Sequence, residues 1–335
     1  MYPLARPFLF AADAERIHEL TIAGLARWPR SVALLAGCPV QAPVRLMGLT
    51  FRNRVGLAAG LDKNGECIEA FDRMGFGFVE IGTVTPRPQA GNPRPRMFRL
   101  PRQRAIINRL GFNNHGVEAL VARAGRARRQ AVLGINIGKN ADTPLERAED
   151  DYLACLAAVH QVADYVTVNI SSPNTAGLRD LQGSGRFELL LQRLVGARDQ
   201  LADKHGVRRP LLVKIAPDME PAQLESIALA ARDSGIDGLI ATNTTVSRPG
   251  LEDAPLASQA GGLSGAPLRP LAEAALGTLR AKLGPDFPLI GVGGILSRAD
   301  AVRRREAGAD LVQIYTGLIY RGPSLVGECA RALRG

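Results

Sequence analysis

The amino-acid sequence predicts an α/β fold of the (β/α)8 barrel type, preceded by a short N-terminal extension of two helices. From residue 54 onward the chain repeats a strand–loop–helix unit, and eight apolar strands can be recognised. Polar residues fall mainly at the carboxyl ends of these strands, which is where a barrel builds its active site. No GxGxxG sequence follows the first strand, which disfavours the alternative of a doubly wound open sheet.

The predicted strands are short, apolar and rich in β-branched residues. They cover Val55–Ala59, Phe76–Ile81, Val132–Ile137, Tyr165–Ile170, Leu211–Ile215, Gly238–Ala241, Pro288–Val292 and Asp310–Tyr315. Segments with helical periodicity lie between them and include Phe187–Ala202, Pro221–Ser234 and Pro267–Lys282. A hairpin at Arg45–Asn53 is expected to close the N-terminal end of the barrel.

Residues 1–40 form the expected extension, and residues 41–335 the expected barrel domain. Asp13 is predicted to cap a helix that runs through Trp28, and a second short helix begins at Ser31 and ends at Gly37. Two such amphipathic helices can pack as a cap on the barrel or lie in a membrane interface. The pattern alone favours the packed cap.

Composition narrows the class of protein further. The 335 residues are 46% hydrophobic, as in ordinary globular proteins, and carry a formal net charge of +10. This charge favours anionic ligands or surfaces, but few aromatic residues and no recognition-helix pattern argue against nucleic acid as a partner. The four cysteines are scattered without a CxxC pair, so no metal site is expected, and free thiols fit a reducing compartment.

The segment around residue 170 is the first candidate site. The apolar strand ending at Ile170 is followed directly by Ser171, Ser172, Pro173 and Asn174. Pro173 takes the chain out of the sheet, and the hydroxyl and amide groups suit a loop folded over a small polar ligand. An ordinary Ser/Asn-rich turn is the alternative reading of this stretch.

Polar or glycine residues recur at the ends of the other strands. They are Lys63, Thr83, Asn136, Asn169, Lys214, Asn243, Gly293 with Gly294, and Tyr315 with Thr316. A lysine at such a position can form a Schiff base or hold negative charge on a ligand. Glycine-rich turns at 261–265, 291–294 and 315–317 predict a phosphate site, since the loops after strands seven and eight usually provide it. An arginine-rich insertion at residues 87–109 can form a lid or favour an anionic substrate or lipid headgroup, and a solvated loop face is the alternative for most of its arginines.

Several ordered segments resemble dihydroorotate dehydrogenase. They are LAAGLDKNGE at 57–66, VEIGTVTP at 79–86, NPRPRMFRL at 92–100, INRLGFNN at 107–114, GINIGKN at 134–140, VNISSPNT at 168–175 and GVGGI at 291–295. The resemblance covers nearly the whole chain and implies a TIM barrel. Serine at position 172 and the N-terminal extension are similar to class 2, the membrane-associated and quinone-linked type. Class 1 enzymes place cysteine at this position and lack the extension.

The resemblance implies FMN as cofactor and dihydroorotate as substrate, which is oxidised to orotate in pyrimidine biosynthesis. The implied FMN residues are Ala59, Gly60, Lys63, Thr83, Asn136, Asn169, Lys214, Thr242, Gly265, Gly294, Tyr315 and Thr316. The implied substrate residues are Lys63, Asn108, Arg109, Leu110, Gly111, Phe112, Asn169, Asn174, Asn243 and Thr244.

The resemblance also implies catalytic roles. Ser172 would take a proton from C5 of the substrate, with Thr175 as a possible relay and Phe112 closing the pocket. The hydride from C6 would pass to FMN N5 on the opposite side, and Lys214 would stabilise the reduced flavin.

The implied second half-reaction reverses the preference for a packed cap. The extension would guide a membrane quinone to the flavin, with His18 and Arg99 as candidate polar groups on that path. The expected protein is a monomer attached peripherally to the cytoplasmic side of a bacterial inner membrane. A class 1-like enzyme with a soluble acceptor and a non-redox phosphate-binding barrel remain alternatives.

Overall fold

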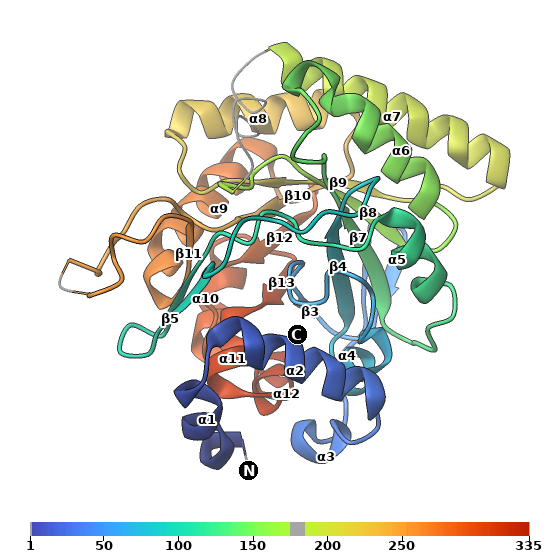
Figure 1. Ribbon diagram of the computed structural model, residues 1–335. Helices are drawn as coiled ribbons and strands as arrows, with labels where there is room; N and C mark the ends of the chain where they lie inside the picture. Colours follow the sequence, from blue (N-terminus) through green and yellow to red (C-terminus); the bar gives the residue numbers. More distant parts are fainter. Residues whose placement is uncertain (1, 175–184, 253, 335) are drawn as a thin grey trace.

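The computed structural model describes residues 2–174, 185–252 and 254–334, and eight parallel strands in it close into a barrel (Figure 1). In order around the barrel they are β3 (Val55–Leu57), β4 (Phe78–Val84), β7 (Val132–Ile137), β8 (Tyr165–Asn169), β9 (Leu211–Ile215), β10 (Gly238–Ala241), β12 (Leu289–Val292) and β13 (Leu311–Ile314). The prediction of a (β/α)8 TIM barrel is therefore confirmed.

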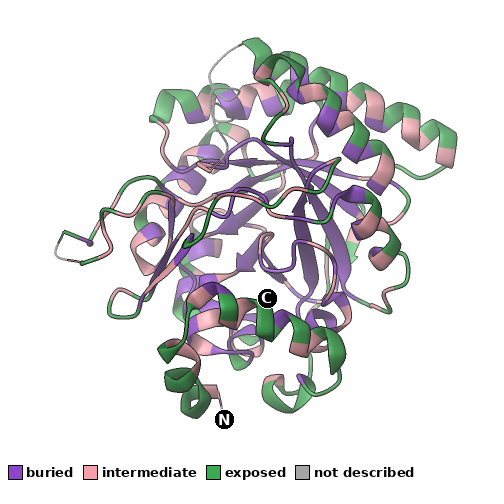
Figure 2. Ribbon diagram, in the orientation of Figure 1, coloured by how far each residue is buried: buried purple, intermediate pink, exposed green. Residues whose placement is uncertain are grey.

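Helices cover the outside of this barrel. They are α4 (Ile68–Arg73), α5 (Val117–Ala124), α6 (Ala148–Val159), α7 (Gly185–His205), α8 (Pro221–Ser234), α9 (Arg269–Leu283), α10 (Arg298–Glu306), α11 (Thr316–Arg321) and α12 (Ser324–Ala332), with the 3-10 turns η1 (Leu145–Arg147) and η3 (Ala266–Leu268). The strands are buried on both faces, so each reads in the sequence as a continuous apolar run (Figure 2).

The strand predictions match β7, β9 and β10 residue for residue, and the second strand differs most. It was expected at Phe76–Ile81, but β4 continues to Val84. Pairing with β7 extends this strand, because Gly82 pairs with Asn136 and Val84 with Ile137. A polar residue inside a strand does not end it when a neighbouring strand supplies the backbone partners.

An antiparallel hairpin, β1 (Val44–Leu46) and β2 (Leu49–Phe51), closes the N-terminal end of the barrel as predicted. Phe51 is fully buried in a cluster with barrel-interior residues, and its ring packs edge-on against Phe78 at 5.4 Å between centroids. Apolar side chains thus seal the barrel interior at its N-terminal end.

The arginine-rich insertion contains β5 (Met97–Leu100) and β6 (Ala105–Asn108), which form a three-stranded antiparallel sheet with β11 (Gly262–Gly265). The glycine-rich segment 261–265 was expected to be a tight turn and is instead mostly this strand. A Cβ at Gly261 would lie 2.3 Å from the carbonyl oxygen of Asn108, so glycine here permits close approach to β6.

The extension contains α1 (Tyr2–Ala11), α2 (Ala14–Arg27) and the short α3 (Ala33–Ala36). The predicted cap of α2 is confirmed, because the Asp13 side chain accepts a hydrogen bond from the amide of Arg16. The sequence analysis missed α1, which carries Pro7 inside the helix. Buried Ile22 and Val32 of the extension belong to the same apolar cluster as the barrel and its helices.

Candidate active site

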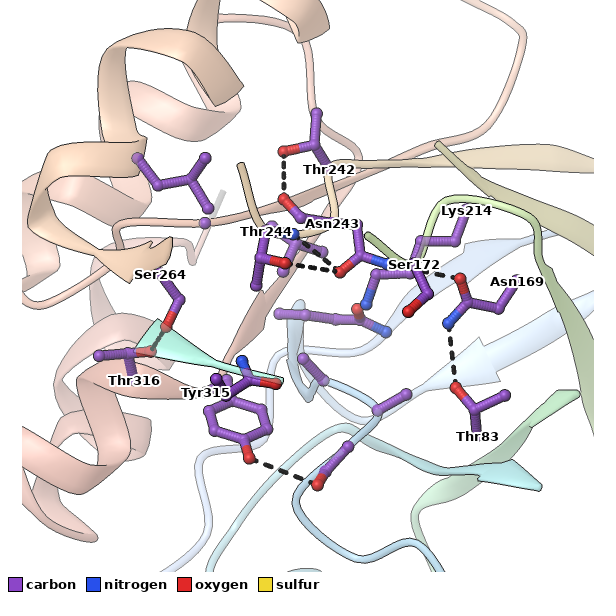
Figure 3. A pocket seen from close by; sticks show the side chains of 18 of the residues that line it. Thr83, Asn169, Ser172, Lys214, Thr242, Asn243, Thr244, Ser264, Tyr315 and Thr316 are labelled. Atoms are coloured by element: carbon purple, nitrogen blue, oxygen red, sulfur yellow. Dashed lines mark hydrogen bonds between the residues drawn. The ribbon is translucent and has the colours of Figure 1, made fainter. Parts of the chain in front are cut away.

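A pocket opens at the carboxyl ends of the barrel strands (Figure 3). Such a pocket, lined by apolar side chains and a few convergent polar groups, is typical of a small-molecule site. The predicted residues that line it are Ala59, Gly60, Lys63, Thr83, Asn108, Leu110, Gly111, Phe112, Asn169, Ser172, Asn174, Lys214, Thr242, Asn243, Thr244, Gly265, Gly294, Tyr315 and Thr316. Residues that lie on, or directly after, seven of the eight barrel strands thus meet residues of the inserted segment at one end of the barrel.

Hydrogen bonds fix the orientation of the amide side chains in the pocket. Asn169 Nδ2 donates to Thr83 Oγ1 at 2.9 Å and to Asn136 Oδ1 at 3.2 Å. Asn243 Nδ2 donates to Ser171 Oγ at 3.1 Å. Since each amide has a defined direction, the pocket offers donors and acceptors in a fixed pattern, which suits a planar ligand with several N–H and C=O groups.

Glu80 of β4 supports this pattern from inside the barrel, where it is fully buried. Its carboxylate accepts hydrogen bonds from Asn136 Nδ2 at 2.8 Å, Tyr165 OH at 2.9 Å and Gln313 Nε2 at 2.8 Å. The first of these bonds turns the Asn136 oxygen toward Thr83 and Asn169. Glu80 was not predicted as a site residue, although a single carboxylate inside an apolar strand was a usable signal.

Two lysines bring positive charge to the pocket. Lys63 follows β3, and burial, followed by the positive charge of Arg96, lowers its pKa to about 8. Lys214 lies on β9 beside Asn169 of β8; burial lowers its pKa, and the negative charge of Glu80 opposes that effect. Lys63 therefore remains largely protonated at neutral pH and can hold an anionic group.

Ser172 lies in the segment that follows β8, and it is buried while lining the pocket. Its Oγ accepts a hydrogen bond from the Asn174 amide at 3.2 Å. Asn174 Nδ2 reaches Asn108 Oδ1 at 3.5 Å, so this segment contacts the end of β6 in the inserted sheet. Thr175, the expected proton relay, lies outside the described residues.

The opposite end of the pocket is formed by glycines and hydroxyls. Thr316 Oγ1 donates to Ser264 Oγ at 2.8 Å, and Gly293 and Gly294 have φ values of 110° and 73°. The fully buried Arg304 lies behind these glycines and donates from Nη2 to the Gly293 carbonyl at 2.6 Å. This bond directs the carbonyl toward Arg304, and the residues form a cradle in which backbone can approach a ligand closely.

The inserted segment reaches the pocket through Gly111 and Phe112. Phe112 has a φ of 53°, a conformation that is rare for a residue other than glycine. Its carbonyl accepts hydrogen bonds from Asn114 Nδ2 at 2.7 Å and Gln89 Nε2 at 3.2 Å. The sequence analysis assigned no role to Asn114 or Gln89, because these contacts give no local pattern.

Four other predicted residues do not line the pocket. Asn136 is fully buried behind Thr83, and the Arg109 side chain turns outward to the Gln259 side chain at 3.0 Å. Arg99 on β5 donates to the Leu9 carbonyl at 2.8 Å and so joins the inserted sheet to α1. Burial, and after it the positive charge of Lys63, lowers the pKa of His18 on α2 to about 3.

Comparison with known proteins agrees with this geometry. The family model described as dihydroorotate dehydrogenase matches residues 41–334. A protein of Alkalilimnicola ehrlichii named dihydroorotate dehydrogenase (quinone) is 60% identical over 336 residues, which cover 99% of both chains. A protein of Chromobacterium violaceum with the same name is 59% identical, over 99% of this chain and 97% of the other.

Solved structures give the same result. The crystal structure of DHODH from Eimeria tenella in complex with ferulenol has a TM-score of 0.89 and 39% sequence identity, and the match covers 96% of this chain and 90% of that one. The segments that resembled this family in the sequence include those that carry the pocket residues. The chain therefore belongs to the dihydroorotate dehydrogenase family, in the class whose members are named dihydroorotate dehydrogenase (quinone).

Proposed function

We propose that this protein oxidises (S)-dihydroorotate to orotate with a quinone as electron acceptor, and that FMN is its cofactor. Family membership supports the reaction, and one feature of the pocket carries the assignment of its residues. That feature is the meeting of Lys63, Ser172 and several oriented asparagines at one end of the barrel. A lysine among amides fits a planar carboxylate ligand that contains a cyclic urea.

The pocket has the groups that FMN requires. The glycines at 293 and 294, with Ser264 and Thr316, would hold the phosphate, and Lys214 would hold negative charge at the ring system. Among the described residues Gln313 Oε1, on a pocket-lining residue, has no hydrogen-bond partner and could accept from a ring N–H. When bound, FMN would accept a hydride from the substrate and donate electrons to the quinone.

Ser172 acts as the base in this proposal. A serine hydroxyl is a weak base at neutral pH, so it needs a closed pocket and a route by which the proton leaves. Ser172 is buried, and the amide of Asn174 donates to its oxygen. Asn169, Asn243 and Lys63 would orient the substrate so that its C5 proton faces this oxygen.

The extension provides the route for quinone. Phe10 and Ala14 pack on an apolar cluster that contains Met97, Tyr320 and the pocket-lining Leu110. The Phe10 and Tyr320 rings are 5.2 Å apart between centroids, and Arg99 lies over the Phe10 ring at 4.7 Å. This cluster connects the extension to the pocket through apolar surface, and Arg99 is a polar group beside it. His18 on α2 remains the second candidate polar group of the route.

The outer surface of the extension would bind the membrane. Most of the exposed large apolar side chains in the described residues belong to it: Leu4, Phe8, Leu20, Trp28, Leu34 and Leu35. No helix among residues 2–174, 185–252 and 254–334 is long and apolar enough to cross a bilayer. The family resemblance and this exposed apolar surface support our proposal of a monomer bound peripherally to the cytoplasmic side of a bacterial inner membrane.

An anaerobic stopped-flow experiment tests the proposal. The FMN-loaded protein is mixed with dihydroorotate, and the visible absorbance of the flavin is followed before and after a short-chain quinone is added. We expect bleaching by substrate and recovery by quinone. Bleaching without recovery would mean that the electron acceptor is not a quinone. No bleaching would refute dihydroorotate as the substrate.

A further inference from the structure

A buried ion pair joins the extension to the inserted sheet. Glu15 on α2 and Arg96 just before β5 are each only 5% exposed. Arg96 Nη2 lies 2.7 Å from Glu15 Oε1, and Arg96 Nε lies 2.9 Å from the same oxygen. Arg94 Nη2 lies 3.3 Å from the same oxygen, but the Arg94 side chain is more than half exposed, so Arg96 is the buried partner of Glu15. Loss of the Glu15 charge therefore leaves the buried guanidinium of Arg96 without its paired carboxylate.

The same guanidinium also holds a turn of the inserted segment. Arg96 Nη1 donates to the carbonyls of Ala90 and Asn92, both at 2.7 Å. A Cβ at Gly91, between them, would lie 2.9 Å from Arg96 Nη1, so the turn closes tightly around this side chain. Arg96 has thus used its Nε, Nη1 and Nη2 groups to connect α2 to this turn.

The turn at residues 90–92 also holds the segment that lines the pocket. The Asn92 amide donates to the Leu110 carbonyl at 3.1 Å, and Asn92 Nδ2 donates to the Arg109 carbonyl at 2.9 Å. Asn92 Nδ2 also lies 3.5 Å from the carbonyl of Asn174, two residues after Ser172. A continuous set of bonds therefore runs from Glu15 to both sides of the proposed substrate site.

We propose that Glu15 of the extension is a positioning residue for substrate binding, acting through Arg96 and the turn at residues 90–92 on the pocket segment at 108–112. The extension would then serve both half-reactions, because it provides the quinone route and also holds the substrate segment. This inference rests on the proposed function, since it assumes that orotate or dihydroorotate binds at Lys63 and the asparagines.

The charges around Lys63 provide a second measurable consequence of the role of Glu15, which is a change in the pKa of Lys63. The charged groups that act on Lys63 are Arg96, which lowers its pKa, and Glu15, Asp62 and Glu19, which raise it. His18 on α2 also faces Lys63, and its low pKa keeps it uncharged. Loss of the Glu15 charge leaves Arg96 uncompensated, so the pKa of Lys63 should fall further.

The neighbouring pair provides a matched control. Glu19 lies one turn further along α2 and bonds to Arg94, and both side chains are about half exposed. Arg94 also lies 3.3 Å from Glu15, so both variants remove a partner of Arg94, and Glu15→Gln alone removes the partner of Arg96. Exposed pairs contribute little because water screens them. Glu15→Gln and Glu19→Gln thus remove the same charge from the same helix, and only the first breaks the buried connection.

Orotate is the probe, because the product of the proposed oxidation does not reduce the oxidised holoenzyme, and its binding can be followed by calorimetric titration. At pH 7 we expect Glu15→Gln to raise the orotate Kd about tenfold and Glu19→Gln to change it less than about twofold. The pH above which binding weakens should move down by about one unit in Glu15→Gln. Hydrogen exchange should become faster at the amides of residues 89–112 in the same variant.

Other results would overturn the inference. An orotate Kd and pH profile that are equal in the two variants would show that Glu15 has no special role. If Glu15→Gln does not fold, the double variant Glu15→Met with Arg96→Met removes both buried charges, and a folded protein with normal orotate affinity would also refute us. Wild-type protein that binds no orotate would instead refute the proposed function.

Discussion

Lys63 gives the sharpest test of the site, because the same burial that makes it useful should destabilise the fold. The side chain is 9% exposed, and its pKa falls from 10.5 to about 8, first through burial and then through Arg96. At about 1.4 kcal/mol per pKa unit this fall corresponds to about 3 kcal/mol at neutral pH. The change Lys63→Met keeps most of the side-chain volume and removes the charge.

The sign of the effect follows from proton binding. Between about pH 8 and pH 10.5 the unfolded chain binds a proton at Lys63 and the folded protein does not, so wild-type stability rises with pH in this window. Below about pH 8 Lys63 is protonated in both states, so the full destabilisation by the buried charge is present. Lys63→Met should therefore be more stable than wild type by up to about 3 kcal/mol at pH 7, or about 4 °C in Tm, and by less than about 1 kcal/mol at pH 10. It should also lose orotate binding.

Thermal unfolding at pH 7 and pH 10 with saturating FMN, together with orotate titration, provides the assay. Lys282→Met serves as the control, since Lys282 is about one-third exposed and pairs with Glu225 on the surface. Its Tm difference from wild type should be small at both pH values. A Tm difference for Lys63→Met that does not change with pH, or a loss of stability at pH 7, would refute the argument that Lys63 is buried as a charge.

Three further predictions follow from the site and the extension. Ser172→Ala should slow flavin reduction by dihydroorotate about 100-fold to 10,000-fold while FMN stays bound, and a near-normal stopped-flow rate would remove Ser172 from the role of base. Arg304→Met should weaken FMN binding at least about tenfold but riboflavin binding much less, because Arg304 supports the phosphate cradle; an equal loss for both ligands in fluorescence titration would contradict this. Phe8→Glu combined with Leu34→Glu should reduce co-sedimentation with anionic lipid vesicles and leave turnover with a short-chain quinone unchanged, since both side chains are about 80% exposed; undiminished vesicle binding would exclude this face from the membrane contact.

Local patterns in the sequence were sufficient for the barrel itself. Apolar β-rich runs alternate with helical segments, and three strands and helix α8 were predicted to the residue. Prediction was weakest for elements whose secondary structure depends on a neighbouring segment that is distant in the sequence. The segment 262–265 became a strand because β6 lies beside it, and α1 forms although Pro7 lies within it. Such elements depend on contacts with distant parts of the chain.

Much of the pocket was also predictable, and for a physical reason. In a parallel barrel the carboxyl ends of all the strands meet at one end, so polar residues placed there in the sequence must converge. Lys63 follows an apolar run, Asn169 ends a strand, and Lys214 lies one residue before the end of another strand. Arg109 shows the limit, because its position next to Asn108 did not reveal that its side chain turns outward.

The sequence by itself determined the fold class, the family resemblance and most of the residues that line the pocket, because these depend on short-range pattern and on the symmetry of the barrel. The tertiary structure alone decided how those residues are held. Glu80 and Gln313 are 233 positions apart, and Glu15 and Arg96 are 81 apart, yet each pair is joined by hydrogen bonds away from water. A charged side chain can be buried only where a partner lies beside it, and the closure of the barrel brings these distant partners together.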